Sequence, residues 1–220
     1  MERLHLDKEL SSLRLKLLEM SSLCDKALAA ALKSAFERDT DLAETVIEGD
    51  SEINRLHCTV DEDTLTVLAR EQPVARDLRF LLGSTYMAAN LERVGDQAVN
   101  IAERAVLLNQ RPALPHNPLM EELALHVQAM FRKAIQAYNA EDADLAMQVC
   151  DMDSHADNLN MKILKHYMDY MIQESRAVER AVHKIIMARC LERVGDQTTN
   201  IAENLIFILK GVDIRQTCRP

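Results

Sequence analysis

The chain has no tryptophan, only four tyrosines and four phenylalanines, and only five glycines and five prolines in 220 residues. Because Gly and Pro mark turns and interrupt regular elements, such a low content leaves room for few loops. Hydrophobic residues make up 48% of the chain, with many Leu, Ala, Met, Glu and Arg, which are good helix formers. This composition predicts an all-α protein with a sizeable core.

Disulfide and membrane signatures are also missing. The five cysteines (Cys24, Cys58, Cys150, Cys190 and Cys218) are an odd number and form no Cys-x-x-Cys pair, so we expect reduced, mostly buried thiols. Residues 1–8 lack the apolar core of a secretion signal, and no apolar stretch approaches the length that spans a bilayer. These features predict a cytoplasmic protein without membrane insertion.

Acidic residues outnumber basic residues along the whole chain. The chain has 26 basic and 35 acidic residues, a net charge of −9, and both residues 1–112 (14 basic, 20 acidic) and residues 113–220 (12 basic, 15 acidic) are acidic. This argues against nucleic acid as a partner and against electrostatic binding to anionic lipid. The chain shows no nucleophile–base arrangement, phosphate-binding Gly loop or cofactor fingerprint, so we expect that it is not an enzyme.

A repeated segment is the strongest positive feature. Residues 91–103 (LERVGDQAVNIAE) and 191–203 (LERVGDQTTNIAE) are identical at eleven of thirteen positions. The repetition continues upstream, where residues 41–56 match residues 144–159 at an offset of 103. Repetition at offsets of 100 and 103 over this length predicts two similar structural units in tandem, with a short length difference between the second and third helices of the two units.

Apolar residues recur at steps of three and four along six segments, which predicts six long helices. They cover about 4–37, 40–71, 73–109, 119–139, 143–173 and 175–211, with Asp39 or Thr40 capping the second and Gly211 ending the sixth. Pro73 is expected in the first turn of the third helix. We predict a three-helix bundle at 1–111, a Pro-rich linker at 112–118, a second three-helix bundle at 119–212 and a tail at 213–220.

Each copy of the repeat places a column of acidic and amide side chains on one face of its helix. The spacing aligns these residues over three turns: Glu92, Asp96, Asn100 and Glu103 in the first copy, and Glu192, Asp196, Asn200 and Glu203 in the second. Like charges at i and i+4 destabilise a helix by about 0.2–0.5 kcal/mol per pair, so we expect a compensating positive charge beside the column. Asp50 and Asn54, and the aligned Asp153 and Asp157, could add oxygens from the preceding helix.

Carboxylate and amide oxygens suit hard cations, so a metal site is one interpretation of the columns, with Mg²⁺, Mn²⁺, Fe³⁺ or Zn²⁺ as candidates. The alternative is a solvated polar face held by salt bridges such as Arg93–Asp96 and Arg193–Asp196. Gly95 and Gly195 lie beside the acids, and they allow either a metal or simply a neighbouring helix to approach closely. A di-iron oxidase site is excluded because no His follows the glutamates at i+3.

The duplicated Leu-Glu-Arg-Val-Gly-Asp signature, together with residues 41–50 and 72–79, resembles the PhoU family of bacterial phosphate-transport regulators over nearly the whole chain. The resemblance implies two three-helix bundles, a cytoplasmic location, homodimers and metal clusters on the acidic faces. It gives a metal-ligand role to Glu92, Asp96, Glu103, Glu192, Asp196 and Glu203, and less directly to Asp50, Asn54, Asp153 and Asp157. Asn100 and Asn200 stand where the family has Asp or Asn.

The function that the resemblance implies is negative regulation of the phosphate regulon and of phosphate uptake. Such a protein would act as an adaptor between the ATPase subunit of the phosphate ABC transporter and the phosphate-sensor histidine kinase. Arg93 and Arg193 would be candidate contacts at the edge of the acidic faces. The alternative is a metal-dependent helical module that acts in metal handling or hydrolysis.

Overall fold

The computed structural model describes the backbone of residues 2–212 and the side chains of residues 5–212, so the predicted tail at 213–220 and Cys218 lie outside it. Over the described residues every regular element is helical, which confirms the predicted fold class. The first bundle comprises α1 (Glu2–Glu37), α2 (Thr40–Glu71) and α3 (Ala75–Asn109). The second comprises α4 (Pro118–Ala140), α5 (Ala143–Gln173), the short 3-10 turn η1 (Ser175–Ala177) and α6 (Val178–Lys210).

Polar side chains fix the helix starts where the sequence places capping residues. The Asp39 carboxylate accepts a hydrogen bond from the backbone N–H of Leu42 (3.0 Å), as a helix cap requires. Asn117 caps α4, and Pro118 is the first residue of that helix rather than the last of a linker, because its missing N–H is not needed there. Gly211 ends α6 in the left-handed region (φ 70°), which confirms the predicted stop.

Two predicted helix starts are wrong by a few residues. The third helix begins at Ala75 and not at Pro73, because Gln72 adopts a left-handed conformation (φ 45°) and the chain stays extended at Val74. Near Ser175 the chain first makes the 3-10 turn, and α6 itself begins at Val178. Neither difference moves the acidic columns, which lie well inside α3 and α6.

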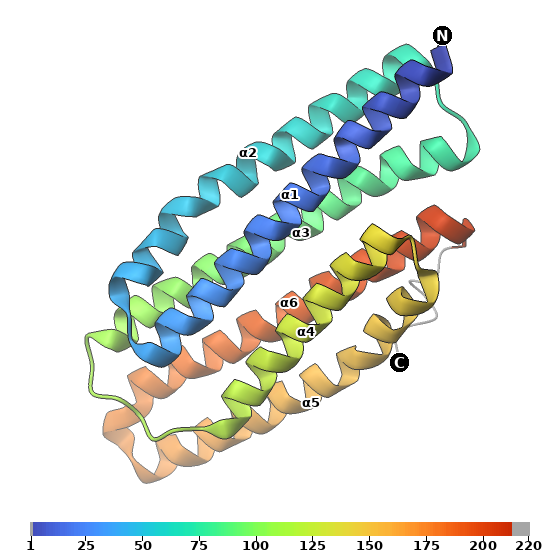
Figure 1. Cartoon of the computed structure of the whole chain (residues 1–220). Helices are drawn as coiled ribbons and strands as arrows, with labels where there is room; N and C mark the ends of the chain where they lie inside the picture. The colour runs from blue at the N-terminus through green and yellow to red at the C-terminus, as the bar shows by residue number, and fades with distance from the viewer. Residues whose placement is uncertain (1, 213–220) are drawn as a thin grey trace.

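Both bundles share one continuous hydrophobic core. On α1 a stripe at helical spacing that includes Leu13, Leu17 and Leu28 is almost fully buried against α2 and α3. The α3 helix packs against α6 about as extensively as against either α1 or α2, and α3 and α6 lie side by side between the bundles (Figure 1). We call this contact the α3–α6 seam.

Contacts at the two ends of the seam show that α3 and α6 are antiparallel. The Asn204 side-chain amide donates to the backbone carbonyl of Gly83 (2.7 Å), and at the opposite end Arg111 pairs with Glu179 (3.0 Å). The two copies of the repeat therefore face each other in opposite directions. Over residues 2–212, none of the helices combines the length and the apolar character that crossing a bilayer requires.

Candidate metal centre

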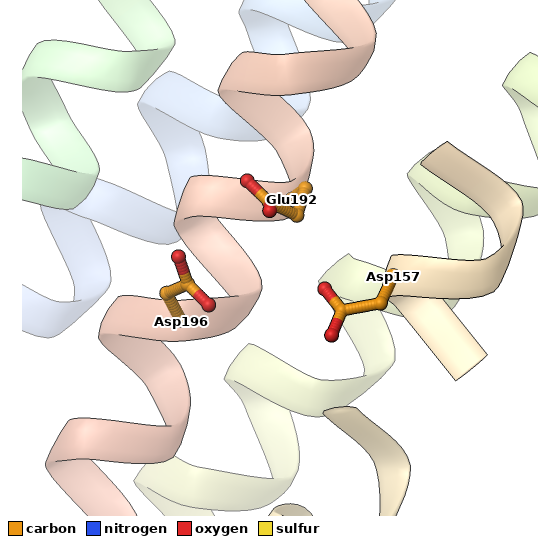
Figure 2. Close-up of side chains that lie close together, drawn as sticks. All are labelled: Asp157, Glu192 and Asp196. Atoms are coloured by element: carbon orange, nitrogen blue, oxygen red, sulfur yellow. The ribbon is translucent and has the colours of Figure 1, made fainter. Parts of the chain in front are cut away.

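Three carboxylates of the second bundle converge between α5 and α6. Asp157, Glu192 and Asp196 each place one oxygen within 4.8 Å of the other two, and no other three His, Cys, Asp or Glu side chains in the described part of the chain do so. Figure 2 shows Asp157 reaching from α5 toward Glu192 and Asp196, which lie on successive turns of α6. We call these three residues the acid group.

Glu192 is the buried member of the acid group, with 9% of its surface exposed. Its Oε1 accepts a hydrogen bond from Arg189 (2.7 Å), whereas its buried Oε2 has no hydrogen-bond partner. Burial raises the pKa of Glu192, and the charges of Asp196 and Asp157 raise it further. A buried carboxylate oxygen without a donor, beside two more carboxylates, fits a hard cation.

Asp153 extends the acid group by one turn of α5. Burial raises the pKa of the half-buried Asp153 carboxyl, and Asp157 adds to the effect. The charge of His126 of α4 lowers the pKa of Asp153. The His126 ring packs edge-on against the ring of His155, with the ring centroids 4.7 Å apart. The acidic repeat gives no signal for His126, because α4 holds no copy of it.

The first bundle has an equivalent but looser set. The Asn54 side-chain amide donates to Oδ2 of Asp50 (2.7 Å), while the buried Oδ1 of Asp50 has no hydrogen-bond partner. Burial raises the pKa values of Asp50 and Glu92, and the charge of Asp96 contributes to both shifts. Both bundles therefore contain neighbouring carboxylates with raised pKa values. In the first bundle, the Asn54 amide already donates to one oxygen of the Asp50 carboxylate.

Gly95 lets α2 approach α3 closely. A Cβ atom at position 95 would lie 3.1 Å from Oδ1 of Asp50 and 3.1 Å from Cδ1 of Ile53. At Gly195 the equivalent atom would lie 3.7 Å from Oδ1 of Asp153, an ordinary contact. Packing of a neighbouring helix therefore accounts for the first glycine, and this packing seats the Asp50 carboxylate against α3.

The C-terminal ends of the two columns, at residues 100–103 and 200–203, lie away from the acid group. Asn100 donates to the backbone carbonyl of Asp96 (2.9 Å), and Glu103 pairs with Arg104 (2.9 Å). Asn200 and Glu203 line a cavity between α3 and α6, apart from the acid group. The two ends of a column, eleven residues apart, are separated by roughly 16 Å along the helix, so they lie beside different helices.

Arg93 and Arg193 are exposed next to the columns, where both could meet a partner. Glu192 of the acid group, however, forms an ion pair with Arg189, which lies one turn before it on α6 (2.7 Å). Arg189 has no counterpart in the first copy, where position 89 is Ala. The spacing of three residues between Arg189 and Glu192 on one helix is the sequence feature that could have predicted this ion pair.

Replacing Glu192 by Gln is expected to stabilise the metal-free protein at neutral pH by at least about 0.5 kcal/mol, because it removes a buried charge that its neighbours repel. The folded-state pKa of Glu192 lies above its unfolded value, so protonation favours the folded state. The free energy of unfolding of the native sequence therefore rises as the pH falls from neutral toward that pKa, and the variant lacks this part of the dependence. Urea denaturation in a chelator at about pH 7 and about pH 5 measures both effects.

The matched control is Glu44→Gln, an exposed carboxylate on α2, which is expected to leave the stability within about 0.5 kcal/mol of the native value. A Glu192→Gln variant that is less stable than the native protein at neutral pH would show that its bond from Arg189 outweighs the repulsion.

Comparison with known proteins finds one family in both halves of the chain. The PhoU domain matches residues 17–105 and again residues 120–205. The phosphate-specific transport system accessory protein PhoU homolog of Pseudomonas aeruginosa is 35% identical over 208 residues, which cover 94% of this chain and 86% of the relative. The corresponding accessory protein of Escherichia coli is 32% identical over 210 residues, with 94% and 86% covered.

Solved structures agree. The crystal structure of PhoU from Pseudomonas aeruginosa has a TM-score of 0.91 at 34% identity and covers 94% of this chain and 99% of that one. The phosphate transport system regulatory protein PhoU from Streptococcus pneumoniae has a TM-score of 0.88 at 22% identity, with 94% and 98% covered, which shows the same fold.

Proposed function

Because this chain belongs to the PhoU family, we propose that it is a negative regulator of the phosphate regulon and of phosphate uptake. It would act in the cytoplasm, as a homodimer and without catalysis, as an adaptor between the ATPase subunit of the phosphate ABC transporter and the phosphate-sensor histidine kinase. The relatives named as accessory proteins of the phosphate-specific transport system support a role beside the transporter, since they match 94% of this chain.

The acid group is the observation that carries the metal part of the proposal. Asp157, Glu192 and Asp196 would hold a cation such as Fe, Zn, Mn or Mg, with Asp153 beside them. The cation would neutralise carboxylates that otherwise repel one another. In the first bundle Asp50, Glu92 and Asp96 would play the same part, and the like charges there also raise the pKa of Glu92.

A neutralised acidic face can receive a protein partner, whereas an unneutralised one repels any acidic surface. Arg93 and Arg193 are exposed at the edge of these faces and would contact the transporter or the kinase there. We therefore propose that metal loading prepares the docking surface and that the two arginines complete it.

The test is alkaline phosphatase activity in phosphate-rich cells that lack this gene. The native gene is expected to return the activity to background, whereas the Glu92→Ala/Glu192→Ala variant is expected to leave it near the level of the deletion. A Glu44→Ala variant serves as the control with an altered exposed carboxylate, and circular dichroism checks that each variant folds.

Each other outcome has a definite meaning. If the native gene does not restore repression, the regulatory role is wrong, and turnover by the purified protein with Mn²⁺ or Fe would favour the metal-dependent module instead. If the double variant represses as well as the native protein, the acidic columns carry no signal and only the structural role remains.

A further inference from the structure

A cavity of about 220 Å³ lies beside residues 113–117, which connect the two bundles. It far exceeds the roughly 10–15 Å³ that one water needs, so it has room for a ligand of several heavy atoms. The end of α1 with Arg38, the first turn of α4, Tyr167 of α5 and Lys184 of α6 complete its lining. We call it the linker cavity.

Two cationic side chains line the linker cavity. Burial lowers the pKa of the partly buried Lys184 ammonium, and the nearby positive charge of Arg38 lowers it further. Across the residues that the structure describes, no carboxylate forms an ion pair with either of them. The one carboxylate in the lining, that of Glu121, lies 3.6 Å from a ring nitrogen of His116 instead. Two like charges with no opposite charge between them favour a bound anion, and above all a divalent one that matches both.

Arg38 is held in position by the end of α3. Its Nη2 atom donates to the backbone carbonyls of Leu108, Asn109 and Arg111, at 2.5–3.0 Å. All of these bonds use one of its three nitrogens, and a guanidinium carries five N–H donors, so it retains donors for a ligand. A donor that is already fixed loses little freedom when a ligand binds, which favours affinity.

Asn117 adds an amide group to the same cavity. Only 7% of its surface is exposed, and its Oδ1 accepts a hydrogen bond from the backbone N–H of Leu119 (3.1 Å). Its buried Nδ2 atom forms no hydrogen bond of standard geometry. Burial raises the pKa of the neighbouring Tyr167 hydroxyl and the amide opposes this, so the two groups lie close together. A buried N–H group without a well-placed acceptor favours an additional oxygen atom from a ligand.

The chain contains a second version of this arrangement at the opposite end of the α3–α6 seam. The offset of 103 relates Asn117 to Arg14 and Arg38 to Glu141. Arg38 and Glu141 each follow the first helix of their bundle and have a positive φ (60° and 53°), which supports the correspondence. Beside a cavity of about 180 Å³, Glu141 pairs with Arg14 (2.5 Å) and with Arg76 (2.7 Å). One end of the seam thus places a carboxylate between its cations, whereas the linker cavity has a cation at the same position.

We propose that the linker cavity binds a small divalent oxyanion of the size of inorganic phosphate or sulfate. Lys184 and Arg38 neutralise its two charges, and their N–H groups donate to its oxygens together with the Asn117 amide. A chain with a net charge of −9 repels anions in general, so such a site requires local positive charge of this kind. The inference does not rest on the proposed function, and its residues lie outside the acidic columns.

The experiment is a calorimetric titration of the full-length protein with inorganic phosphate. The protein is first freed of metal and then dialysed free of chelator, so that no ion at the acid group can hold the anion. We expect saturable binding of one phosphate per chain and binding of sulfate at the same site. Chloride is expected to compete at least about tenfold more weakly, because its single charge meets only one of the two cations.

Glycerol phosphate is the probe for a phosphate group carried by a larger molecule. It is expected to bind no more tightly than inorganic phosphate, because the proposed contacts are all made with the anion itself.

Lys184→Met is expected to weaken phosphate binding at least about tenfold, because it removes a hydrogen bond between charged groups. The variant is expected to remain folded, since it removes a partly buried charge that Arg38 repels. Lys8→Met is the matched control, an exposed lysine near the other end of α1, and it is expected to leave the phosphate affinity unchanged.

Asn117→Asp supplies a carboxylate within the chain, as Glu141 does at the other end of the seam. Asp caps a helix about as well as Asn, so the start of α4 is expected to remain intact, which circular dichroism checks. The new carboxylate pairs with the two cations, so phosphate affinity is expected to fall at least about tenfold while the free energy of unfolding does not decrease.

Four results would overturn the proposal: no saturable binding of phosphate by the native protein, equal losses for Lys184→Met and Lys8→Met, full phosphate affinity in a folded Asn117→Asp variant, or tighter binding of glycerol phosphate than of inorganic phosphate. None of these measurements uses metal affinity or alkaline phosphatase activity. Failure of this site and failure of the proposed function are therefore distinguishable.

Discussion

Glu192→Gln is expected to weaken binding of Mn²⁺ or Zn²⁺ by the second bundle at least about 100-fold. Changes of residues that merely support metal ligands cost about 10–100-fold in affinity, and Glu192 would be a ligand itself. It is also the buried member of the acid group, with an oxygen that lacks a hydrogen-bond donor. Calorimetric titration of metal-free protein measures the affinity, and elemental analysis after dialysis counts the ions.

The control for this prediction is Glu203→Gln, which alters the same column about three turns later. Glu203 lines the cavity between α3 and α6 and is not a member of the acid group, so its replacement is expected to leave the metal affinity unchanged. Arg189→Gln is expected to strengthen binding, because the Arg189 guanidinium competes with a cation for Glu192. Equal losses for Glu192→Gln and Glu203→Gln would show instead that the whole column holds metal.

The same side chain connects this prediction with the stability of the metal-free protein. Glu192 is expected to destabilise the fold when no cation is present, because burial and two neighbouring carboxylates disfavour its charge. A residue kept at such a position is consistent with a ligand, since charge repulsion in the empty site becomes attraction in the filled one. A gain in stability together with a loss of metal affinity in one variant would therefore identify a ligand rather than a structural carboxylate.

Local features of the sequence were enough to predict the fold. Apolar residues at steps of three and four mark each buried helix face, and capping residues such as Asp39 and Gly211 mark helix ends. The duplicated segment shows that the second unit resembles the first. The helix start at Pro73 was misplaced because a left-handed residue such as Gln72, without a glycine, leaves no sequence signal.

The candidate site was predictable only in part. Spacing along one helix identifies Glu192 and Asp196 as neighbours, and the upstream repeat points to Asp157. Spacing cannot show which helix each turn of the column faces, and it gave no sign that Glu203 lines a cavity between α3 and α6. Glu203 and Tyr86, more than one hundred residues apart, line the same cavity because of how the two bundles pack, and no local sequence pattern records this.

The packing of the two bundles leads to the final prediction, at Gly83. A Cβ atom there would lie 2.4 Å from Cδ1 and 2.5 Å from Cγ1 of Ile208 across the seam. Gly83→Val is therefore expected to lower the free energy of unfolding by about 3 kcal/mol, since overpacking of a filled core costs about 1–3 kcal/mol and valine adds three carbons. Urea denaturation followed by circular dichroism measures the loss.

The matched control is Gly49→Val, also inside a helix, where a Cβ atom would meet nothing within 4 Å. Its effect is expected to stay within about 0.5 kcal/mol, because both residues are weak helix formers. Adding Ile208→Ala to Gly83→Val makes room for the new methyl groups. The double variant is therefore expected to lose less free energy of unfolding than the sum of the two single losses, with a difference of about 1–3 kcal/mol. Additive losses would mean that Gly83 and Ile208 are not in contact, and that other residues hold α3 and α6 together.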